Sequence, residues 1–511
     1  MRFSKPCLRT DNYHQAIKMR IRSIIWFTLL AAAPLGAQIP SSEYSARRTA
    51  LAQKLGNGIL VALGNPEPEE DFISFNQNSN FRYLTNFSEP DAALVMVIKN
   101  NAIVGSPMLF VQPSDPGREV WTGHRVGIPG VRTSLGMEGR DFATLSKVVD
   151  SLVAAQPSAT LFTVGSIDAE DPMLTRDEQI VSGFTKGTNR LEMKSANGEV
   201  ANLRRIKTAA ELDLIRRAVN ITVGAQRDAM RLIAPGMNEF EVQSLIEYNF
   251  RRNGADRPSF STIVGSGPNS TTLHYNADDR FIDANDVIVM DIGASYRGYA
   301  ADVTRTVPAD GSFSDAQRDI YTAVRAAQAA AEAAAKVNVP GRALSDAANA
   351  SLDASLAKLG LIEAPGAMYE CSPGRECTQR SLYYMHSLGH GIGLDVHDPG
   401  AAAGTAPLIP GSAFTIEPGI YVRANLLDII PNTPKNQALI AKIRPAVQKY
   451  GNIGVRIEDD YIVTDSGVEW ISRAPRELNE IETIMKEAWT GPSPRDPATV
   501  EAYRSTGRRV P

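Results

Sequence analysis

Half of the histidines in this 511-residue chain lie close together in the sequence. Of the six, His386, His390 and His397 fall within twelve positions. Three glycines interrupt this segment, so a regular helix is not expected, and it lacks the His-Glu-x-x-His pattern of helical zinc proteases. The glycines do not follow the order of a dinucleotide-binding loop either. A lone histidine is most often structural, but three in one short loop indicate a chemical role.

Two aspartates lie in apolar runs on either side of a predicted Arg-Gly turn. If Tyr296 pairs with Tyr299 across that turn, Asp302 lies opposite Gly293 and becomes a diagonal neighbour of Asp291. A backbone separation of roughly 7 Å would leave room for metal ions between the two carboxylates. Charged groups inside apolar strands are costly unless compensated, and a cation is the simplest compensation. The alternative is a solvated hairpin face, and this segment alone does not decide between them.

Two glutamates lie beside β-branched residues, Glu417 in Thr-Ile-Glu-Pro-Gly and Glu458 in Val-Arg-Ile-Glu-Asp-Asp. Each segment predicts a buried strand, and a buried glutamate is often paired with an arginine such as Arg456. Together the four segments supply four carboxylates and one imidazole: Asp291, Asp302, His390, Glu417 and Glu458. This oxygen-rich set favours hard or borderline ions such as Mn²⁺ over a structural zinc ion. Several bridging carboxylates suit two ions roughly 3.5 to 4 Å apart, as in two-metal hydrolases.

The order Asp, Asp, His, Glu, Glu, with these spacings and contexts, resembles the pita-bread metallopeptidases, among them the Xaa-Pro aminopeptidases and prolidase. The resemblance covers residues 203 to about 485. Earlier motifs resemble the non-catalytic N-terminal domain of that family: Phe75-Asn-Gln77, the stretch from Asn80 to Pro90, and Trp121-Thr-Gly123. The resemblance implies an α+β fold in which a smaller α/β domain precedes a pita-bread catalytic domain built of a duplicated helix pair and antiparallel sheet.

The resemblance also implies a ligand set for two divalent ions, of which Mn²⁺ is expected. Asp291 would bind one ion, His390 and Glu417 the other, and Asp302 and Glu458 would bridge them. A metal-bridging hydroxide would attack the carbonyl of the bond that precedes proline. Glu417 would also carry the proton from this water to the leaving nitrogen.

Four further residues are given catalytic or supporting roles by the same resemblance. His397 would hydrogen-bond the substrate, while His274 and His386 would line the pocket for the prolyl residue. Arg456 would support Glu458. The expected reaction is release of the N-terminal residue from Xaa-Pro peptides. The alternatives are a dipeptidase restricted to free Xaa-Pro and a non-catalytic binding relative. Members of the family are commonly dimers or tetramers, so a homo-oligomer is expected.

The patterns around these residues predict the elements that must position them. Residues 38–200 alternate short apolar runs with turn signals and one helical stretch, which predicts an α/β domain. Residues 201–485 repeat a scheme of two helices followed by strands, which predicts an internally duplicated domain. Residues 486–511 predict a frayed tail. The predicted helices run from Thr208 to Pro235, from Asn238 to Asn253, from Ser314 to near Pro340 and from Ser345 to Leu359.

The N-terminal segment predicts export. Residues 1–37 combine a basic stretch, a short apolar run and a small residue, which is typical of a secretory signal rather than a membrane span. Met19 offers an alternative start to Met1. In an exported protein, Cys371 and Cys377, which flank a Pro-Gly turn, predict a small disulfide loop.

Composition narrows the classes of partner. The formal net charge is −4, with 53 basic and 57 acidic residues, so neither a nucleic-acid footprint nor a polybasic membrane surface is expected. With 43% hydrophobic residues the chain is not a multi-span membrane protein, and no stable membrane insertion is expected after signal cleavage. Two departures from the family pattern are Asn86, where relatives commonly have glycine, and a predicted surface insertion between Glu417 and Glu458 near the mouth of the site.

Overall fold

The computed structural model describes residues 38–69, 74–156, 158–166, 175–184, 193–400, 404–491, 498 and 501. The predicted signal segment and most of the predicted C-terminal tail lie outside the described residues. No helix within the described ranges is long and apolar enough to cross a membrane. The α+β fold class predicted from the sequence is confirmed.

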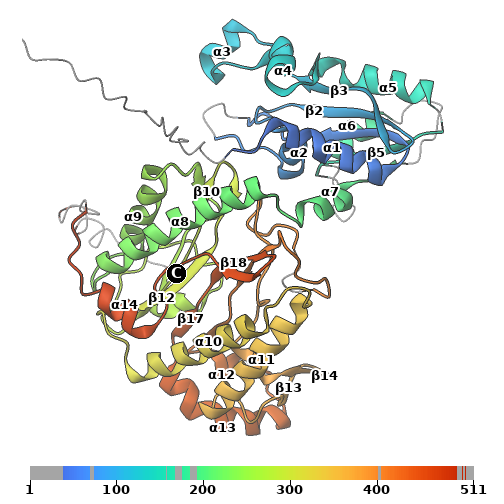
Figure 1. Ribbon diagram of the computed structural model, residues 1–511. Helices are drawn as coiled ribbons and strands as arrows, with labels where there is room; N and C mark the ends of the chain where they lie inside the picture. The colour runs from blue at the N-terminus through green and yellow to red at the C-terminus, as the bar shows by residue number, and fades with distance from the viewer. Residues whose placement is uncertain are drawn as a thin grey trace, which may run out of the picture. The chain divides into compact units, whose positions relative to one another are not determined.

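The N-terminal domain is a mixed sheet of six strands with helices on both faces (Figure 1). The strand order is β4-β3-β2-β1-β5-β6. The strands are β1 (Gly58–Leu63), β2 (Ala93–Lys99), β3 (Ala102–Val111), β4 (Glu138–Asp141), β5 (Thr160–Val164) and β6 (Met193–Ser195). The helices are α1 (Ser41–Leu55), α2 (Ser79–Thr85), α3 (Pro116–Thr122), α4 (Gly127–Leu135), α5 (Leu145–Ala155), α6 (Arg176–Gly183) and α7 (Asn197–Arg204).

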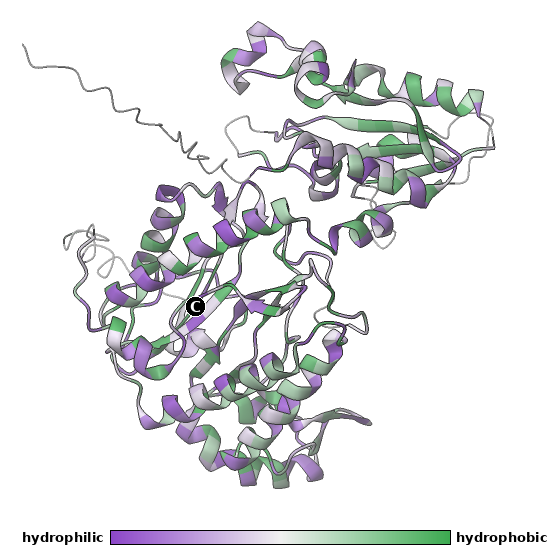
Figure 2. Cartoon of the chain, viewed as in Figure 1, coloured by the Kyte–Doolittle hydropathy of each residue, from purple (hydrophilic) through white to green (hydrophobic). Residues whose placement is uncertain are grey.

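Both faces of the central strand β1 are buried. Leu60 and Ala62 belong to a core shared with α1, α2 and α7, whereas Ile59, Val61 and Leu63 belong to a second core shared with α5 and α6. Successive side chains of a strand point to opposite faces, so an uninterrupted apolar run needs cover on both. Figure 2 shows hydrophobic colour along strands in the middle of this sheet.

Asn86 ends helix α2 in the left-handed conformation, with φ of 57°. Its backbone N–H donates to the carbonyl of Arg82, and its side-chain oxygen accepts from the hydroxyl of Tyr44. Asparagine tolerates this conformation better than most residues. The turn expected where relatives commonly have glycine is therefore present.

The catalytic domain repeats a helix pair and a set of strands. The first half holds α8 (Ala209–Leu232), α9 (Glu239–Arg252), β7 (Arg257–Pro258), β8 (Ile263–Ser266), β9 (Val287–Ile292), β10 (Ala294–Tyr296), β11 (Tyr299–Ala300) and β12 (Val303–Pro308). The second holds α10 (Asp315–Ala334), α11 (Gly341–Lys358), β13 (Met368–Ser372), β14 (Arg375–Thr378), β15 (Ala413–Ile416), β16 (Gly419–Val422), β17 (Ile453–Arg456), β18 (Asp459–Thr464) and β19 (Gly467–Trp470), followed by α14 (Leu478–Ile484). In Figure 1, strands β12, β17 and β18 lie between the two helix pairs.

Three of the four predicted helix starts, those with capping boxes, match the structure closely. Capping boxes begin α8, α9 and α10 as predicted. Helix α10, however, ends at Ala334, and α11 begins at Gly341 rather than at Ser345. Pro340 is extended, with ψ of 141°, and occupies the N-cap of α11. Proline disfavours helix in the residue before it, so here it starts the second helix instead of ending the first.

The predicted surface insertion between the two glutamates is an ordered helical segment. It contains α12 (Leu426–Ile429) and α13 (Pro434–Tyr450), and Leu439, Ile443 and Val447 of α13 are buried in the core of the catalytic domain. Residues 423–452 therefore contribute to the packed body of the domain. The predicted disulfide is present as well: Cys371 and Cys377 join β13 to β14, with their Cα atoms 5.7 Å apart.

Candidate functional site

The two aspartates come together through a hairpin whose register is the predicted one. Tyr296 pairs with Tyr299, and further along Ile292 pairs with Val303, which places Asp302 opposite Gly293. A Cβ atom at position 293 would lie 1.9 Å from the carbonyl oxygen of Ala301, so only glycine fits at this crossing. Asp291 and Asp302 are both buried.

The second half of the domain brings the histidine loop to the two glutamates. Glu417 directly follows β15, and Glu458 lies between β17 and β18. The carbonyl of His390 accepts from the N–H of Thr415, and the His390 N–H donates to the Thr415 hydroxyl at 3.2 Å. A Cβ at Gly389 would lie 2.1 Å from the Thr415 carbonyl oxygen. The loop thus needs glycine because it packs directly on the strand that delivers Glu417.

The structure gathers three of the predicted carboxylate ligands around an imidazole nitrogen of His390, a fourth predicted ligand. His390 Nε2 lies 3.5 Å from Asp302 Oδ2, 3.5 Å from Glu417 Oε1 and 3.9 Å from Glu458 Oε1. Ligand atoms of Asp302, His390 and Glu458 all lie within 4.8 Å of one another. The Nδ1 atom of His390 lies 3.0 Å from the Gly391 carbonyl, which directs Nε2 toward the carboxylates.

The donor set fits divalent metal ions. Asp291 Oδ1, Asp302 Oδ1 and Glu458 Oε1 are buried and have no hydrogen-bond partner among the described residues. Buried carboxylate oxygens without donors are unfavourable, and a cation is the group that would satisfy several of them together. Four carboxylates and one imidazole are also the ligand types that hard and borderline divalent ions accept. The fifth predicted ligand, Asp291, lines the same cavity, and its Oδ1 atom is one of these buried oxygens.

Burial and crowding perturb the acidity of these groups. Burial, with the neighbouring carboxylates, raises the pKa of Glu458 to about 8 and raises the pKa values of Asp302 and Glu417 well above their usual range. Burial also lowers the pKa of His390 to about 4, so its imidazole is neutral and available as a ligand at neutral pH. Metal binding therefore has to displace protons from the carboxylic acids.

This acidity predicts how stability depends on pH. Between pH 6.5 and 8.5 the Glu458 carboxyl of the unfolded chain is already ionised, whereas the folded, metal-free protein holds its proton until about pH 8. A raised folded pKa gives stability that is lost as the pH rises through it. The melting temperature of the metal-free protein should therefore fall across this window, and Mn²⁺ should raise it most at the alkaline end. Differential scanning fluorimetry with and without Mn²⁺ measures this. Glu458→Gln should flatten the metal-free slope, and a wild-type slope of opposite sign would contradict the prediction.

Two buried glutamines hold the strands that carry the ligands. Gln226 of α8 donates from Nε2 to the carbonyls of Met290 at 3.0 Å and Val303 at 2.8 Å, next to the two aspartates. Gln328 of α10 donates to Asp459 Oδ2 at 2.9 Å and to the carbonyls of Ile416 and Ile457, each of which precedes a predicted ligand glutamate. Each half of the domain therefore has a buried glutamine whose side chain donates to the backbone next to the predicted ligands. Sequence reasoning missed it, although both glutamines lie on the apolar faces of predicted helices.

Arg456 contacts a different ligand from the one predicted. Its guanidinium pairs with the Asp291 carboxylate and donates to the Tyr421 hydroxyl at 2.8 Å. No hydrogen bond or ion pair between Arg456 and the Glu458 side chain is found within the described residues, although the arginine charge acts to lower the pKa of Glu458. Burial and charge oppose each other here: desolvation acts to lower the pKa of the buried arginine, but Tyr421 and the carboxylates of Asp291, Glu458 and Glu417 raise it well above its usual value.

A cavity of about 550 Å³ opens onto the predicted ligands. Its lining includes the predicted substrate-handling residues His274, His386 and His397 and the predicted supporting residue Arg456, together with the apolar side chains of Phe260, Ile263, Leu273 and Val396. His386 Nε2 lies 2.8 Å from the Tyr421 hydroxyl, and the rings of His390 and His397 are 4.2 Å apart. No described residue of the helical insertion lines this cavity. The mouth is therefore formed by other segments.

The loop that carries His397 is held by buried ion pairs that the sequence did not reveal. Asp398 pairs with Arg204 and, at 2.9 Å, with Lys207. Asp395 lies 2.6 Å from Arg204 and accepts from the Ser79 hydroxyl. Both cations lie more than 180 residues earlier in the chain. They tie the histidine loop to the junction between α7 and α8.

Comparisons with known proteins agree with this geometry. The family model described as Aminopeptidase P, N-terminal domain, matches residues 44–162, and that described as Metallopeptidase family M24 matches residues 213–465. An Xaa-Pro aminopeptidase of Haemophilus influenzae is 31% identical over 88% of this chain and 98% of its own length. A human Xaa-Pro dipeptidase is 28% identical over 88% of this chain and 94% of its own.

Solved structures of aminopeptidase P are also similar to this chain. A variant of Escherichia coli aminopeptidase P in complex with substrate superposes with a TM-score of 0.74 at 28% identity, covering 88% of this chain and 98% of that one. Proline aminopeptidase P II of Yersinia pestis gives a TM-score of 0.72 at 28% identity, covering 88% and 99%. Both domains are matched in sequence, and the pita-bread fold and the clustered carboxylates agree with them. The chain is therefore a member of metallopeptidase family M24 and carries the N-terminal domain of the aminopeptidase P group.

Proposed function

We propose that this chain is a metal-dependent Xaa-Pro aminopeptidase, which hydrolyses the bond before proline and releases the N-terminal residue of a peptide. The observation that carries the proposal is the cluster of His390, Asp302, Glu417 and Glu458 at the floor of a cavity that three further histidines line. The resemblance to Xaa-Pro aminopeptidases over both domains supports the substrate class.

Two divalent ions would be held by Asp291, Asp302, His390, Glu417 and Glu458, and when bound they would lower the pKa of a water molecule and polarise the scissile carbonyl. Mn²⁺ is the ion we propose, because oxygen ligands outnumber nitrogen ligands four to one. A zinc-substituted form of the Escherichia coli relative has been crystallised with product, so metal identity requires direct measurement.

Glu417 is suited to move a proton at this site. It is buried beside Glu458, and in the metal-free protein both features raise its pKa well above the usual range. Its Oε2 lies 3.4 Å from His386 Nδ1 on the cavity side. Proline leaves with a nitrogen that must be protonated, and Glu417 would deliver that proton.

His386 is fixed in one neutral form by its neighbours. Burial lowers its pKa to about 4. Arg456 donates to the Tyr421 oxygen, so the Tyr421 hydroxyl is left to donate to His386 Nε2. The imidazole proton is then on Nδ1, which lies 2.9 Å from the Ser387 carbonyl. This chain of contacts orients the ring at the wall of the cavity, where it would contact the prolyl residue together with His274. His397, from the same loop, would hydrogen-bond the substrate.

We further propose that residues 1–37 direct export and that the mature enzyme forms a homo-oligomer. The disulfide between Cys371 and Cys377 supports an oxidising compartment, because disulfides are rare in the cytosol.

The second candidate is an Xaa-Pro dipeptidase, which the similarity to the human dipeptidase keeps in consideration. The mature protein with Mn²⁺ should cleave the tripeptide Ala-Pro-Ala with a kcat/KM at least about tenfold above that for Ala-Pro, since a dipeptidase gains nothing from residues beyond proline. Product release is measured by chromatography, with Ala-Ala-Ala as the control for selectivity. Cleavage of Ala-Pro alone would favour the dipeptidase and reject the aminopeptidase.

A further inference from the structure

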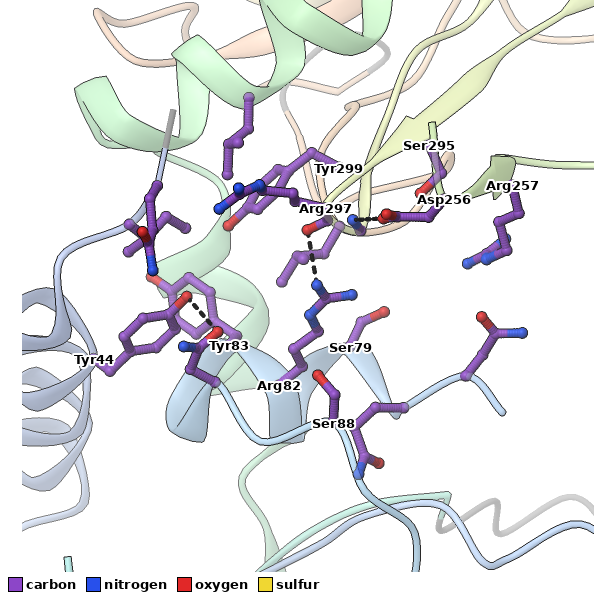
Figure 3. Close-up of a pocket in the computed structure, with 18 of the residues that line it drawn as sticks. Tyr44, Ser79, Arg82, Tyr83, Ser88, Asp256, Arg257, Ser295, Arg297 and Tyr299 are labelled. Atoms are coloured by element: carbon purple, nitrogen blue, oxygen red, sulfur yellow. Dashed lines mark hydrogen bonds between the residues drawn. The ribbon is translucent and has the colours of Figure 1, made fainter. Parts of the chain in front are cut away.

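A second cavity, of about 430 Å³, is lined by both domains and contains arginines from each. Arg82 reaches it from α2, Arg257 from β7 and Arg297 from the turn between β10 and β11. Figure 3 shows the Arg82 and Arg257 side chains extending toward the same opening, with Ser79 and Ser88 at its floor.

These arginines are not neutralised by the protein. No carboxylate in the described part of the chain lies within ion-pair distance of Arg82, Arg257 or Arg297. Arg82 donates to the Arg297 carbonyl at 2.8 Å and Arg257 to the Pro258 carbonyl at 3.1 Å, which are neutral partners. The cavity has one acidic lining residue, Asp256, whose carboxylate accepts from the Gly298 N–H. A surplus of guanidinium groups in a polar cavity suits a carboxylate ligand.

Three adjacent cavities, which share lining residues, form a path from this cavity to the site that holds the predicted ligands. A small cavity of about 230 Å³ lies between them. It shares Val396 and His397 with the site cavity, and it shares Arg257 and Leu394 with the arginine cavity. Residues 394–397 span at most about 11 Å even when fully extended. About three residues of an extended peptide would cover the distance from His397 to the rim of the arginine cavity.

The direction of a bound peptide follows from the chemistry, and this step rests on the proposed function. An aminopeptidase leaves only one residue on the N-terminal side of the bond that it cuts. A path several residues long can therefore be filled only by the part of the peptide downstream of proline. We propose that this path binds the downstream segment of peptides of about five residues or more, and that Arg82 and Arg257 hold a carboxylate of that segment.

The carboxylate has two possible sources, the C-terminus of a short peptide or an acidic side chain of a longer one. Three pentapeptides separate them: Ala-Pro-Ala-Ala-Ala as free acid, the same peptide as C-terminal amide, and Ala-Pro-Ala-Ala-Glu as amide. The wild-type kcat/KM for the free acid should exceed that for the plain amide about fivefold, mainly through KM. If an acidic side chain suffices, the kcat/KM of the glutamate amide should equal that of the free acid. If the site requires the C-terminal carboxylate, it should equal that of the plain amide. The preference for a carboxylate should shrink at high salt.

The double variant Arg82→Gln/Arg257→Gln should reduce the acid-to-amide ratio from about five to about one. Arg342→Gln is the matched control, because it removes an exposed arginine that lines neither cavity, and its ratio should equal that of the wild type. Equal wild-type rates for all three pentapeptides, with Ala-Pro-Ala still cleaved, would overturn the carboxylate site and leave the proposed function intact. Failure of the wild type to cleave any Xaa-Pro peptide would overturn both.

Discussion

Replacing Asp302 with alanine is expected to lower kcat/KM for an Xaa-Pro tripeptide by at least about 1,000-fold, or ~4 kcal/mol of transition-state stabilisation. Asp302 is buried, its Oδ1 has no hydrogen-bond partner among the described residues, and its Oδ2 lies 3.5 Å from His390 Nε2. Its carboxyl group interacts electrostatically with Asp291 of the first half of the domain and with Glu417 and Glu458 of the second. Its loss would remove a shared ligand, so metal content should fall together with turnover.

Measurement requires kinetics and metal analysis on the same preparation. Asp213→Asn is the matched control, because it removes one acidic charge from the exposed face of α8 and should change neither activity nor metal content. A further readout separates metal loss from misfolding. The metal-free Asp302→Asn protein should be at least as stable as the metal-free wild type, because the substitution removes a carboxyl group that its surroundings disfavour in the charged form. Turnover that survives the loss of Asp302 would reject the two-metal arrangement.

The sequence predicts this site well where the chemistry depends on local spacing. One short turn sets the register of the hairpin, so pairing Tyr296 with Tyr299 also places Asp302 opposite Gly293. Helix starts are predictable for the same reason, since a capping box is complete within four residues. The disulfide closes a loop of only six positions.

The contacts of the site that the sequence did not predict are those between segments far apart in the chain. The partner of Arg456 is Asp291, 165 positions earlier, and the nearby Glu458 was the natural guess from sequence alone. Gln226 and Gln328 look like ordinary helical residues until the strands beneath them are known. Lys207 and Asp398 are 191 positions apart. No local pattern marks a lysine that will be buried against a particular aspartate.

The buried ion pairs of Asp398 are expected to stabilise the fold and to position the loop that carries His397. The side chains of Asp398 and Lys207 are each 1% exposed, and that of Arg204 is 5% exposed. Asp398→Ala would leave two cations buried without this partner, which typically costs about 3 to 5 kcal/mol. Urea-induced unfolding should show the loss as a lower midpoint. Asp346→Ala removes one partner of an exposed pair, 71% and 65% accessible, and should cost less than about 1 kcal/mol.

The same substitution should affect catalysis through His397, the neighbour of Asp398. The Asp398 carboxylate also accepts from the Asp395 N–H at 3.2 Å, so it fixes both sides of the residue that we place against the substrate. We therefore expect Asp398→Ala, assayed well below its unfolding temperature, to lower kcat/KM for Ala-Pro-Ala about tenfold to 100-fold while metal content stays at the wild-type level. Asp398→Asn keeps the shape of the side chain and one hydrogen bond. Its kcat/KM should therefore lie between those of the wild type and Asp398→Ala. If Asp398→Ala and Asp346→Ala shift the unfolding midpoint equally, the buried ion pairs do not hold the loop. If activity and metal are lost in proportion, the loop supports the metal ligands rather than the substrate.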